Sequence, residues 1–243
     1  MTTTSKQPRN AIESARRTIE LELRAVEQLQ HRIDESFTHA VELLSAVKGR
    51  VIVSGMGKSG HIGNKIAATL ASTGTPAQFV HPAEACHGDM GMITRSDAAL
   101  LMSNSGTTAE ITALLPLLKR LGLPIVAMTG NPDSTLARAA DAHLNISVDE
   151  EACPLDLAPT ASTTANLVMG DALAIAMLEQ SGFTEEDFAF THPGGALGRR
   201  LLTRVSDVLV TGSDIPKVSL TMSLADALME ISAKGLGMST VVD

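Results

Sequence analysis

The sequence has no tryptophan and no tyrosine, and phenylalanine occurs only five times in 243 residues. Proteins that bind single-stranded nucleic acids stack the bases on aromatic side chains, and this chain has almost none. Positive charge is also scarce, because 19 lysines and arginines stand against 27 aspartates and glutamates, for a net charge of -8. Such a charge repels a phosphate backbone. We therefore expect no nucleic-acid partner.

Long hydrophobic runs are missing as well. No stretch approaches the roughly 18 uninterrupted apolar residues that are typical of a membrane-spanning helix. The N-terminal segment MTTTSKQPRN has no apolar core of the kind that a signal peptide needs. We therefore expect a soluble, cytoplasmic protein with no membrane partner.

Cysteine occurs only at Cys86 and Cys153, which lie far apart in the sequence and form no C-x-x-C pair. Neither a disulfide framework nor a structural zinc knuckle is indicated. We expect two buried, reduced thiols.

The N-terminal part of the sequence is helical in pattern. From about residue 10 to residue 47, apolar residues recur at helical spacing among many charged ones. This pattern predicts an amphipathic helical arm. Because a long exposed apolar stripe marks a protein–protein contact, we expect the arm to pack on other subunits.

The middle of the chain alternates strand-like and helix-length segments. Short β-branched or apolar runs occupy residues 51–53, 78–80, 98–102, 124–128 and 143–148. Helix-length stretches occupy residues 59–72, 108–121, 134–140 and 160–180. This alternation predicts an α/β fold with a parallel sheet in a three-layer α/β/α sandwich.

The C-terminal part changes character. A glycine-rich stretch begins at His192, and a linker-like segment covers residues 211–216. The remaining sequence predicts a helix over residues 224–233 and a strand over 239–242, which is too little to bury its own core. We interpret it as the beginning of a second domain.

A first glycine-rich loop, Ser54 to Gly60, follows the strand at 51–53. Glycines there let backbone amides approach an anion at the start of the next helix. The order Gly57-Lys58-Ser59 is not a nucleotide P-loop, since Ile52 stands where that motif needs glycine. The spacing of Gly55, Gly57 and Gly60 matches the dinucleotide fingerprint, but the next strand has no carboxylate at its end for a ribose. The alternative interpretation of this loop is a tight turn between strand and helix, with a solvated lysine at Lys58.

A second loop, Ser103-Asn104-Ser105-Gly106-Thr107-Thr108, precedes the helix predicted at 108–121. Its four hydroxyls surround one glycine, and hydroxyls with free amides can bind a phosphate monoester. The alternative is an ordinary helix N-cap, where serine and threonine are common. The density of hydroxyls favours phosphate binding.

These two loops resemble those of the sugar isomerase (SIS) domain. Three further segments narrow the resemblance to the D-arabinose 5-phosphate isomerase family: Glu84 to Met92, Glu151 to Leu155, and Thr191-His192-Pro193-Gly194-Gly195-Ala196-Leu197-Gly198-Arg199. The resemblance implies a helical arm over residues 1–48 and a SIS domain over 49–204. Residues 205–243 resemble the opening of the first repeat of a CBS pair.

The resemblance implies an aldose-ketose isomerase that interconverts D-arabinose 5-phosphate and D-ribulose 5-phosphate and feeds 3-deoxy-D-manno-octulosonate for lipopolysaccharide or capsule. It implies a homotetramer and four catalytic residues, Lys58, Glu110, Glu151 and His192. The substrate-binding positions that we expect are Ser54, Gly55, Ser59, His87, Ser103, Ser105, Thr107 and Thr108. The sequence Thr107-Thr108-Ala109 departs from relatives that carry an acidic residue or serine after the glycine, which leaves the details of phosphate coordination open.

Isomerisation needs a base for the C2 proton, a group that moves protons between the oxygens, and positive charge near the enediolate. Lys58 suits the last task, or it is a surface lysine. Glu110 and Glu151 are candidate bases, although Glu110 also suits the first turn of a helix and Glu151 lies in an acidic run typical of a solvated loop. His192 carries an imidazole, which suits proton transfer between sugar oxygens or ring opening, or it is a hydrogen-bonded loop histidine. Which of them removes the C2 proton stays open.

Potential metal ligands gather at His81, Cys86, His87 and Asp89, but their spacing is irregular for a zinc site. We expect no cofactor and no required metal, with inhibitory zinc possible at His87 or His192.

Two other functions remain open from the residues alone. SIS domains also serve as phosphosugar sensors in transcription regulators, and a dehydrogenase would use the first loop. The arm lacks the basic charge of a DNA-reading element, which disfavours the sensor.

Overall fold

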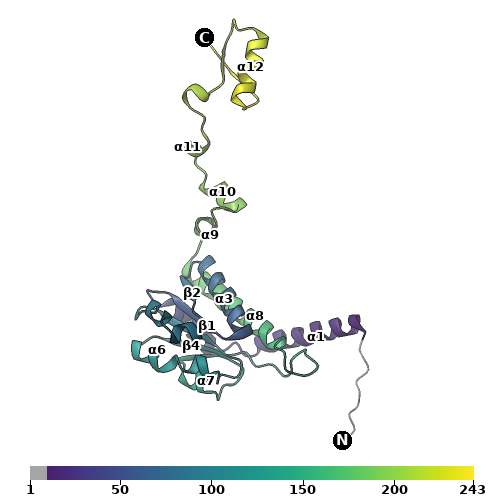
Figure 1. The fold of residues 1–243 in the computed structure, drawn as a ribbon, viewed down its shortest axis with the longest axis vertical. Coiled ribbons are helices and arrows are strands. Elements are labelled where there is room, and N and C mark those ends of the chain that lie inside the picture. The colour runs from purple at the N-terminus through teal and green to yellow at the C-terminus, as the bar shows by residue number, and fades with distance from the viewer. Residues whose placement is uncertain (1–9) are drawn as a thin grey trace. The chain divides into compact units, whose positions relative to one another are not determined.

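The computed structural model describes residues 10–243, so residues 1–9 of the predicted arm lie outside the described part of the chain. The chain forms two units, one ending at Thr191 and the other covering His192–Asp243. Figure 1 labels the helices and strands in chain order.

A five-stranded parallel sheet forms the centre of the first unit. Its strand order is β2-β1-β3-β4-β5. The bounds are β1 Val51–Gly55, β2 Ala77–Phe79, β3 Ala98–Met102, β4 Ile125–Thr129 and β5 Ala142–Asn145. Every residue of β1, β3 and β4 is buried, as expected for a parallel sheet that is covered on both faces. The predicted parallel sheet is therefore confirmed.

Alternate residues of β1, β3 and β4 enter two separate cores, because side chains alternate between the faces of a sheet. Val53 and Leu100 belong to one core, and Ile52 and Leu101 belong to the other. The first core is covered by α2 (Glu35–Ser45), α3 (Gly57–Ser72) and α8 (Ala161–Ser181). The second is covered by α4 (Pro82–Cys86), η1 (Asp89–Met92), α5 (Ala109–Thr112), α6 (Leu115–Leu121) and α7 (Thr135–Ala139). This arrangement is the predicted three-layer α/β/α sandwich, with α3 and α8 together on one side of the sheet and α6 and α7 on the other (Figure 1).

The helix predicted over residues 108–121 is divided into α5 and α6. The prediction of one continuous helix is wrong because of Pro116, which has no N–H to donate to the carbonyl of Thr112. Backbone bonds from Leu114 to Ile111 and from Leu117 to Leu114 span three residues and mark the tightened turn between the two helices.

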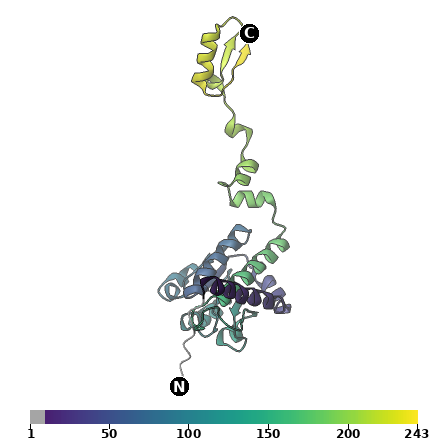
Figure 2. The same cartoon turned by 90° about the vertical axis from the view of Figure 1, so that its right-hand side faces the viewer.

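The N-terminal arm is also two helices, α1 (Ala11–Gln30) and α2, and it packs on its own chain. The two helices are separated by residues 31–34. Asp34 is the N-cap of α2, and its Oδ1 accepts from the N–H of Ser36 at 2.9 Å. The inner face of α1 buries Leu21, Ala25 and Leu29, and α1 lies against α8 (Figure 2).

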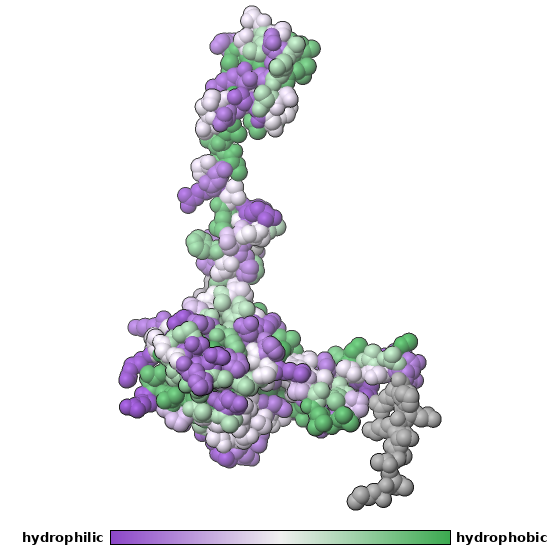
Figure 3. Space-filling view, viewed as in Figure 1, coloured by the Kyte–Doolittle hydropathy of each residue, from purple (hydrophilic) through white to green (hydrophobic). Residues whose placement is uncertain are grey.

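The outer face of α1 is apolar as well. Ile12, Ile19 and Leu23 are 61%, 60% and 58% exposed. Figure 3 shows hydrophobic surface along this helix. The arm therefore has one apolar stripe that its own chain covers and a second that it leaves open.

Helix α8 is long and apolar enough to cross a membrane by length and composition. Half of that stretch is buried inside the protein, where α8 contacts α1, α2 and α3. These contacts are those of a core helix.

The two cysteines correct one expectation. Cys86 is exposed and Cys153 is half-buried, so the prediction of two buried thiols is wrong. Cys86 is the last residue of the short helix α4, whose buried residues are Pro82 and Ala85.

The first unit ends with α9 (Glu185–Thr191). The second unit contains α10 (Ala196–Leu202), α11 (Val205–Val208), η2 (Gly212–Asp214), β6 (Lys217–Ser219), α12 (Leu224–Lys234) and β7 (Thr240–Val242). Strands β6 and β7 pair in parallel around α12, which agrees with the predicted helix and strand.

Candidate functional site

The two predicted loops lie side by side at the point where the strand order reverses. Strands β1 and β3 are neighbours in the sheet. The chain continues from β1 to β2 at one edge and from β3 to β4 and β5 toward the other edge, so the crossovers that follow β1 and β3 run over opposite faces of the sheet. In parallel α/β sheets, ligands bind in the crevice beyond the carboxyl ends of such strands. Gly55 is the register partner of Met102, so both loops begin at the same edge of the sheet.

In the first loop, a close approach of backbone fixes the start of α3. A Cβ on Gly60 would lie 2.6 Å from the carbonyl oxygen of Gly55, so this position requires glycine. Ser54 is 1% exposed, and its hydroxyl has no hydrogen-bond partner among the described residues. Lys58 is exposed in the first turn of α3, and Ser59 beside it is half-buried. The loop therefore holds a buried hydroxyl and an exposed cation at one helix start.

In the second loop, the hydroxyls divide into an inner and an outer pair. The inner pair, Ser103 and Thr108, is joined by a 2.7 Å hydrogen bond, and Ser103 Oγ also accepts from the N–H of Gly106 at 3.0 Å. The outer pair, Ser105 and Thr107, is more accessible, and both the N–H and the hydroxyl of Thr107 donate to Ser105 Oγ, at 3.3 and 3.2 Å. The inner pair shapes the loop, and the outer pair is accessible to a ligand.

Gly106 allows this shape. Its φ of +66° lies in the left-handed region, and a Cβ there would meet Ser134 Oγ at 2.0 Å. Its carbonyl accepts from the N–H of Leu136 at 3.0 Å, which fixes the loop to α7. Only glycine suits both the backbone and the contact.

The carboxylate of Glu151 is held at the start of α8. Its Oε2 accepts from the N–H and the hydroxyl of Thr160 at 2.7 and 2.9 Å and from the N–H of Ser162 at 3.3 Å. Burial on its own would raise the pKa of Glu151, but the hydrogen bonds from Ser162 and Thr160 outweigh it and lower that pKa. Glu151 is thus ionised at neutral pH. The stability from these bonds is present above the unfolded-state pKa and is lost as the pH falls through the lowered folded-state value.

A cavity of about 280 Å³ connects Glu151 with the second loop. Asn104, between Ser103 and Ser105, lines it on one side, and residues of the segment after β5 line the other. Those residues are Val148, Asp149, Glu150, Glu151, Asp156, Leu157 and Pro159. The volume approaches the roughly 300 Å³ at which small-molecule sites begin. The structure thereby brings together the hydroxyl-rich loop and one of the four predicted catalytic residues.

The other predicted residues have separate positions. Glu110 is exposed in the first turn of α5, directly after the second loop, and His87 is exposed at the end of α4. His192 is the first residue of the second unit.

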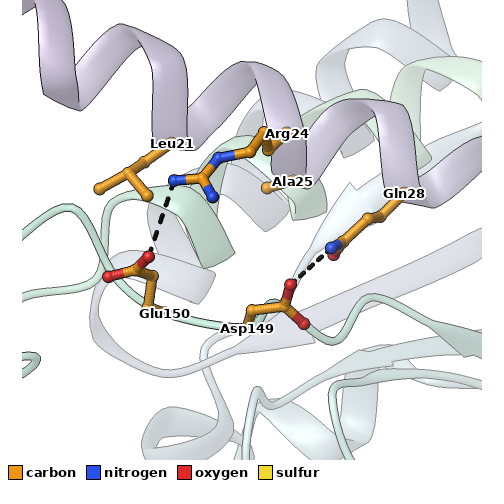
Figure 4. A pocket seen from close by; sticks show the side chains of 6 residues that line it. All are labelled: Leu21, Arg24, Ala25, Gln28, Asp149 and Glu150. Atoms are coloured by element: carbon orange, nitrogen blue, oxygen red, sulfur yellow. Dashed lines mark hydrogen bonds and ion pairs between the residues drawn. The ribbon is translucent and has the colours of Figure 1, made fainter.

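Helix α1 contacts the segment that precedes Glu151, residues 147–150. The sequence pattern alone did not predict these contacts. Arg24 pairs with Glu150 at 3.7 Å, and Gln28 Nε2 donates to Asp149 Oδ2 at 2.6 Å (Figure 4). The pocket between them measures about 20 Å³, which is room for about one water molecule and not for a sugar.

Two arginines extend these contacts, Arg17 in α1 and Arg32 two residues beyond its end. Arg17 Nη2 donates to the carbonyl of Ala152, and Arg32 Nη1 donates to the carbonyl of Ser147. We call the contacts of Arg17, Arg24, Gln28 and Arg32 with residues 147–152 the α1 clasp. Arg17, Arg24 and Gln28 are spaced by seven and four residues, which places these three side chains on one face of α1.

No group of three metal-ligating side chains occurs in the described part of the chain, residues 10–243. His81, Cys86, His87 and Asp89 thus form no such group there.

Comparison with known proteins agrees with the fold and the loops. Residues 43–176 match the SIS domain family. The arabinose 5-phosphate isomerase KdsD of Pseudomonas aeruginosa is 66% identical over 96% of this chain and 71% of its own length. The enzyme of that name from Escherichia coli K12 is 56% identical over 95% of this chain and 70% of its own length.

A solved structure with a bound sugar phosphate is also similar to this chain. The protein c3406 of E. coli CFT073, in complex with arabinose 5-phosphate, is 43% identical, with a TM-score of 0.73, over 79% of this chain and all of that chain. The fold, the two loops at the strand reversal and the family match define the chain as a SIS-domain protein. Within that class, it belongs to the family of the arabinose 5-phosphate isomerases KdsD.

Proposed function

We propose that this chain is an aldose-ketose isomerase that interconverts D-arabinose 5-phosphate and D-ribulose 5-phosphate through an enediol. The observation that carries the proposal is the similarity to the P. aeruginosa enzyme over nearly the whole chain. The arabinose 5-phosphate complex of the 43% identical E. coli protein supports the same substrate. The product would feed 3-deoxy-D-manno-octulosonate for lipopolysaccharide or capsule.

We infer that the phosphate binds between the two loops. The accessible hydroxyls of Ser105 and Thr107 and the start of α3 at Ser59 offer donors to a dianion. The partnerless, buried hydroxyl of Ser54 adds one more donor at the carboxyl end of β1. Ser103, Thr108 and Gly55 shape the loops behind these donors, and His87 is a further proposed substrate contact.

The sugar end would then lie toward Glu151. Its ionised carboxylate can accept a proton, and it shares a cavity with the second loop through Asn104. Glu110 follows the same loop in the first turn of α5, and it is the other proposed carboxylate base.

Positive charge and proton transfer complete the reaction. The side chain of Lys58 makes no hydrogen bond or ion pair with the described residues, so its ammonium is available to a phosphate or an enediolate oxygen. His192 is proposed to move protons between the sugar oxygens or to assist ring opening. We propose that these residues act with no cofactor and no required metal, and that zinc at His87 inhibits.

We further propose a cytoplasmic homotetramer. The open apolar stripe of α1, Ile12, Ile19 and Leu23, supports contact with another copy of the chain. The burial of α8 within the core supports a location outside the membrane. Residues 1–48, 49–204 and 205–243 stay assigned to the arm, the SIS domain and the opening of a CBS repeat.

The test is product identification. The chain is incubated with D-ribulose 5-phosphate, and the sugar phosphates are separated and identified by NMR. We expect D-arabinose 5-phosphate. Formation of D-ribose 5-phosphate or D-xylulose 5-phosphate, or no product, contradicts the proposal. A rise in melting temperature with NAD would instead favour a dehydrogenase.

A further inference from the structure

The carboxylate of Glu151 is bound asymmetrically. The bonds from Thr160 N, Thr160 Oγ1 and Ser162 N all end on Oε2. Oε1 receives none of these three bonds. A carboxylate has accepting lone pairs on both oxygens, so Oε1 stays able to accept a proton.

Thr160 makes two of these three bonds, and the side chain of Ser162 also helps to lower the pKa of Glu151. The Thr160 hydroxyl has a second role. While Oγ1 donates to Glu151 Oε2 at 2.9 Å, it accepts from the N–H of Ala152 at 2.8 Å. One oxygen atom thus fixes both the side chain of Glu151 and the backbone that follows it. On the other side, the N–H of Glu151 donates to Asp156 Oδ1 at 2.9 Å.

The orientation of this carboxylate matters because Glu151 lines the cavity that also contains Asn104 of the second loop. Catalytic groups must lie within about 0.5 Å of their productive positions, and a glutamate side chain can rotate about several bonds. A fixed Oε2 limits that freedom.

We propose that Thr160 is a positioning residue for the isomerisation, whose hydroxyl holds Oε2 of Glu151 against the start of α8 so that Oε1 is presented to the sugar. This inference rests on the proposed function. Thr160 acts through Glu151 and does not itself touch the substrate.

The test compares three variants of the full chain in the direct assay with D-arabinose 5-phosphate. Thr160→Val removes the hydroxyl at nearly constant volume, and Thr160→Ser keeps it. Thr163→Val is the matched control, because Thr163 Oγ1 lies in the same turn and donates to the carbonyl of Thr160 at 2.8 Å without contacting Glu151. Thr160→Ala replaces Thr160→Val if the valine variant does not fold.

For Thr160→Val we expect kcat to fall about ten-fold or more with KM changed less than about three-fold, because misplacement by about 1 Å costs up to about a hundred-fold. Thr160→Ser should keep kcat within about two-fold, and Thr163→Val should do the same. In a Glu151→Gln background, Thr160→Val should cause no further loss.

Three results overturn the inference: an unchanged kcat in Thr160→Val, an equal loss in Thr163→Val, or a further loss in the Glu151→Gln background. Each of these leaves the proposed function standing, provided that the wild type isomerises D-arabinose 5-phosphate. A wild type without that activity overturns the proposed function itself.

Discussion

The second loop, residues 103–108, reaches through Asn104 the cavity that residues of the segment 147–160 line, but the loop and the segment are held in different ways. The loop is fixed largely by hydrogen bonds among its own residues, such as the bond between Ser103 and Thr108, five residues apart. The segment is held by Arg17 and Gln28 of α1 and by Arg32 just beyond its end, whose partners lie 135, 121 and 115 residues further along the chain. Local sequence therefore shapes the proposed phosphate end of the site, whereas tertiary contacts position the proposed catalytic end.

Removing the proposed base should have the largest effect. Glu151→Gln keeps an oxygen that accepts from Thr160 but cannot accept a proton from carbon. We expect kcat to fall by about 10²-fold to 10⁴-fold, the usual range for a general base. Steady-state kinetics measure this. The control is Glu150→Gln, because Glu150 also lines the cavity but contacts Arg24. Equal losses in the two variants would contradict the assignment of Glu151.

Adding a side chain at Gly106, the glycine of the second loop, should have the next largest effect, on the free energy of unfolding. Gly106→Ala combines a φ of +66° with a Cβ 2.0 Å from Ser134 Oγ. We expect a loss of about 2–4 kcal/mol in the free energy of unfolding. Urea titration measures it.

Gly122→Ala separates the two causes. Gly122 has a φ of +78°, but a Cβ there would meet nothing within 4 Å. Only the backbone cost of about 1 kcal/mol should appear. If both variants lose the same free energy, the contact with Ser134 does not constrain the loop.

Breaking the α1 clasp should affect activity more than stability. Arg17→Met removes the donor to the carbonyl of Ala152, beside Glu151. We expect about 1 kcal/mol less free energy of unfolding and a kcat lowered about three-fold to ten-fold. The control is Arg16→Met, since Arg16 is exposed on the same helix. An activity equal to that of the control would show that α1 does not position Glu151.

The exposed ion pair of the clasp should matter least. The Arg24 and Glu150 side chains are 58% and 53% exposed and lie 3.7 Å apart. We expect Arg24→Gln to change the free energy of unfolding by less than about 0.5 kcal/mol. Thermal unfolding at low and high salt checks this. A melting temperature several degrees lower at low salt would mean that the pair of Arg24 and Glu150 stabilises the protein more than its exposure indicates.

Most of the fold follows from the sequence pattern. The buried runs at Val51–Gly55, Ala98–Met102 and Ile125–Thr129 are apolar enough to indicate central parallel strands. Where the structure departs from the predicted helical pattern, chemistry at single residues overrides the apolar spacing. Pro116 divides a helix whose apolar spacing continues past it, and Asp34 begins a new helix within the arm.

The site was predictable only where its contacts are local. The serine and threonine residues of the second loop stand together in the sequence, so their proximity needs no tertiary information. Thr160 and Asp156 were missed because their role is to bond Glu151, nine and five residues away in an irregular segment. The position of Thr160 directly before the long apolar helix was the available signal. No such signal existed for the α1 clasp, since its charged and polar side chains are typical of any solvated helix face.

The most direct test of the account is isomerisation in deuterium oxide. D-Ribulose 5-phosphate is incubated with the wild type and with Glu151→Gln, and the products are followed by NMR. The account predicts that the wild type forms D-arabinose 5-phosphate with solvent deuterium at C2 and that Glu151→Gln forms it at least about a hundred-fold more slowly. Arabinose 5-phosphate formed at equal rates by both, or formed by neither, would contradict it.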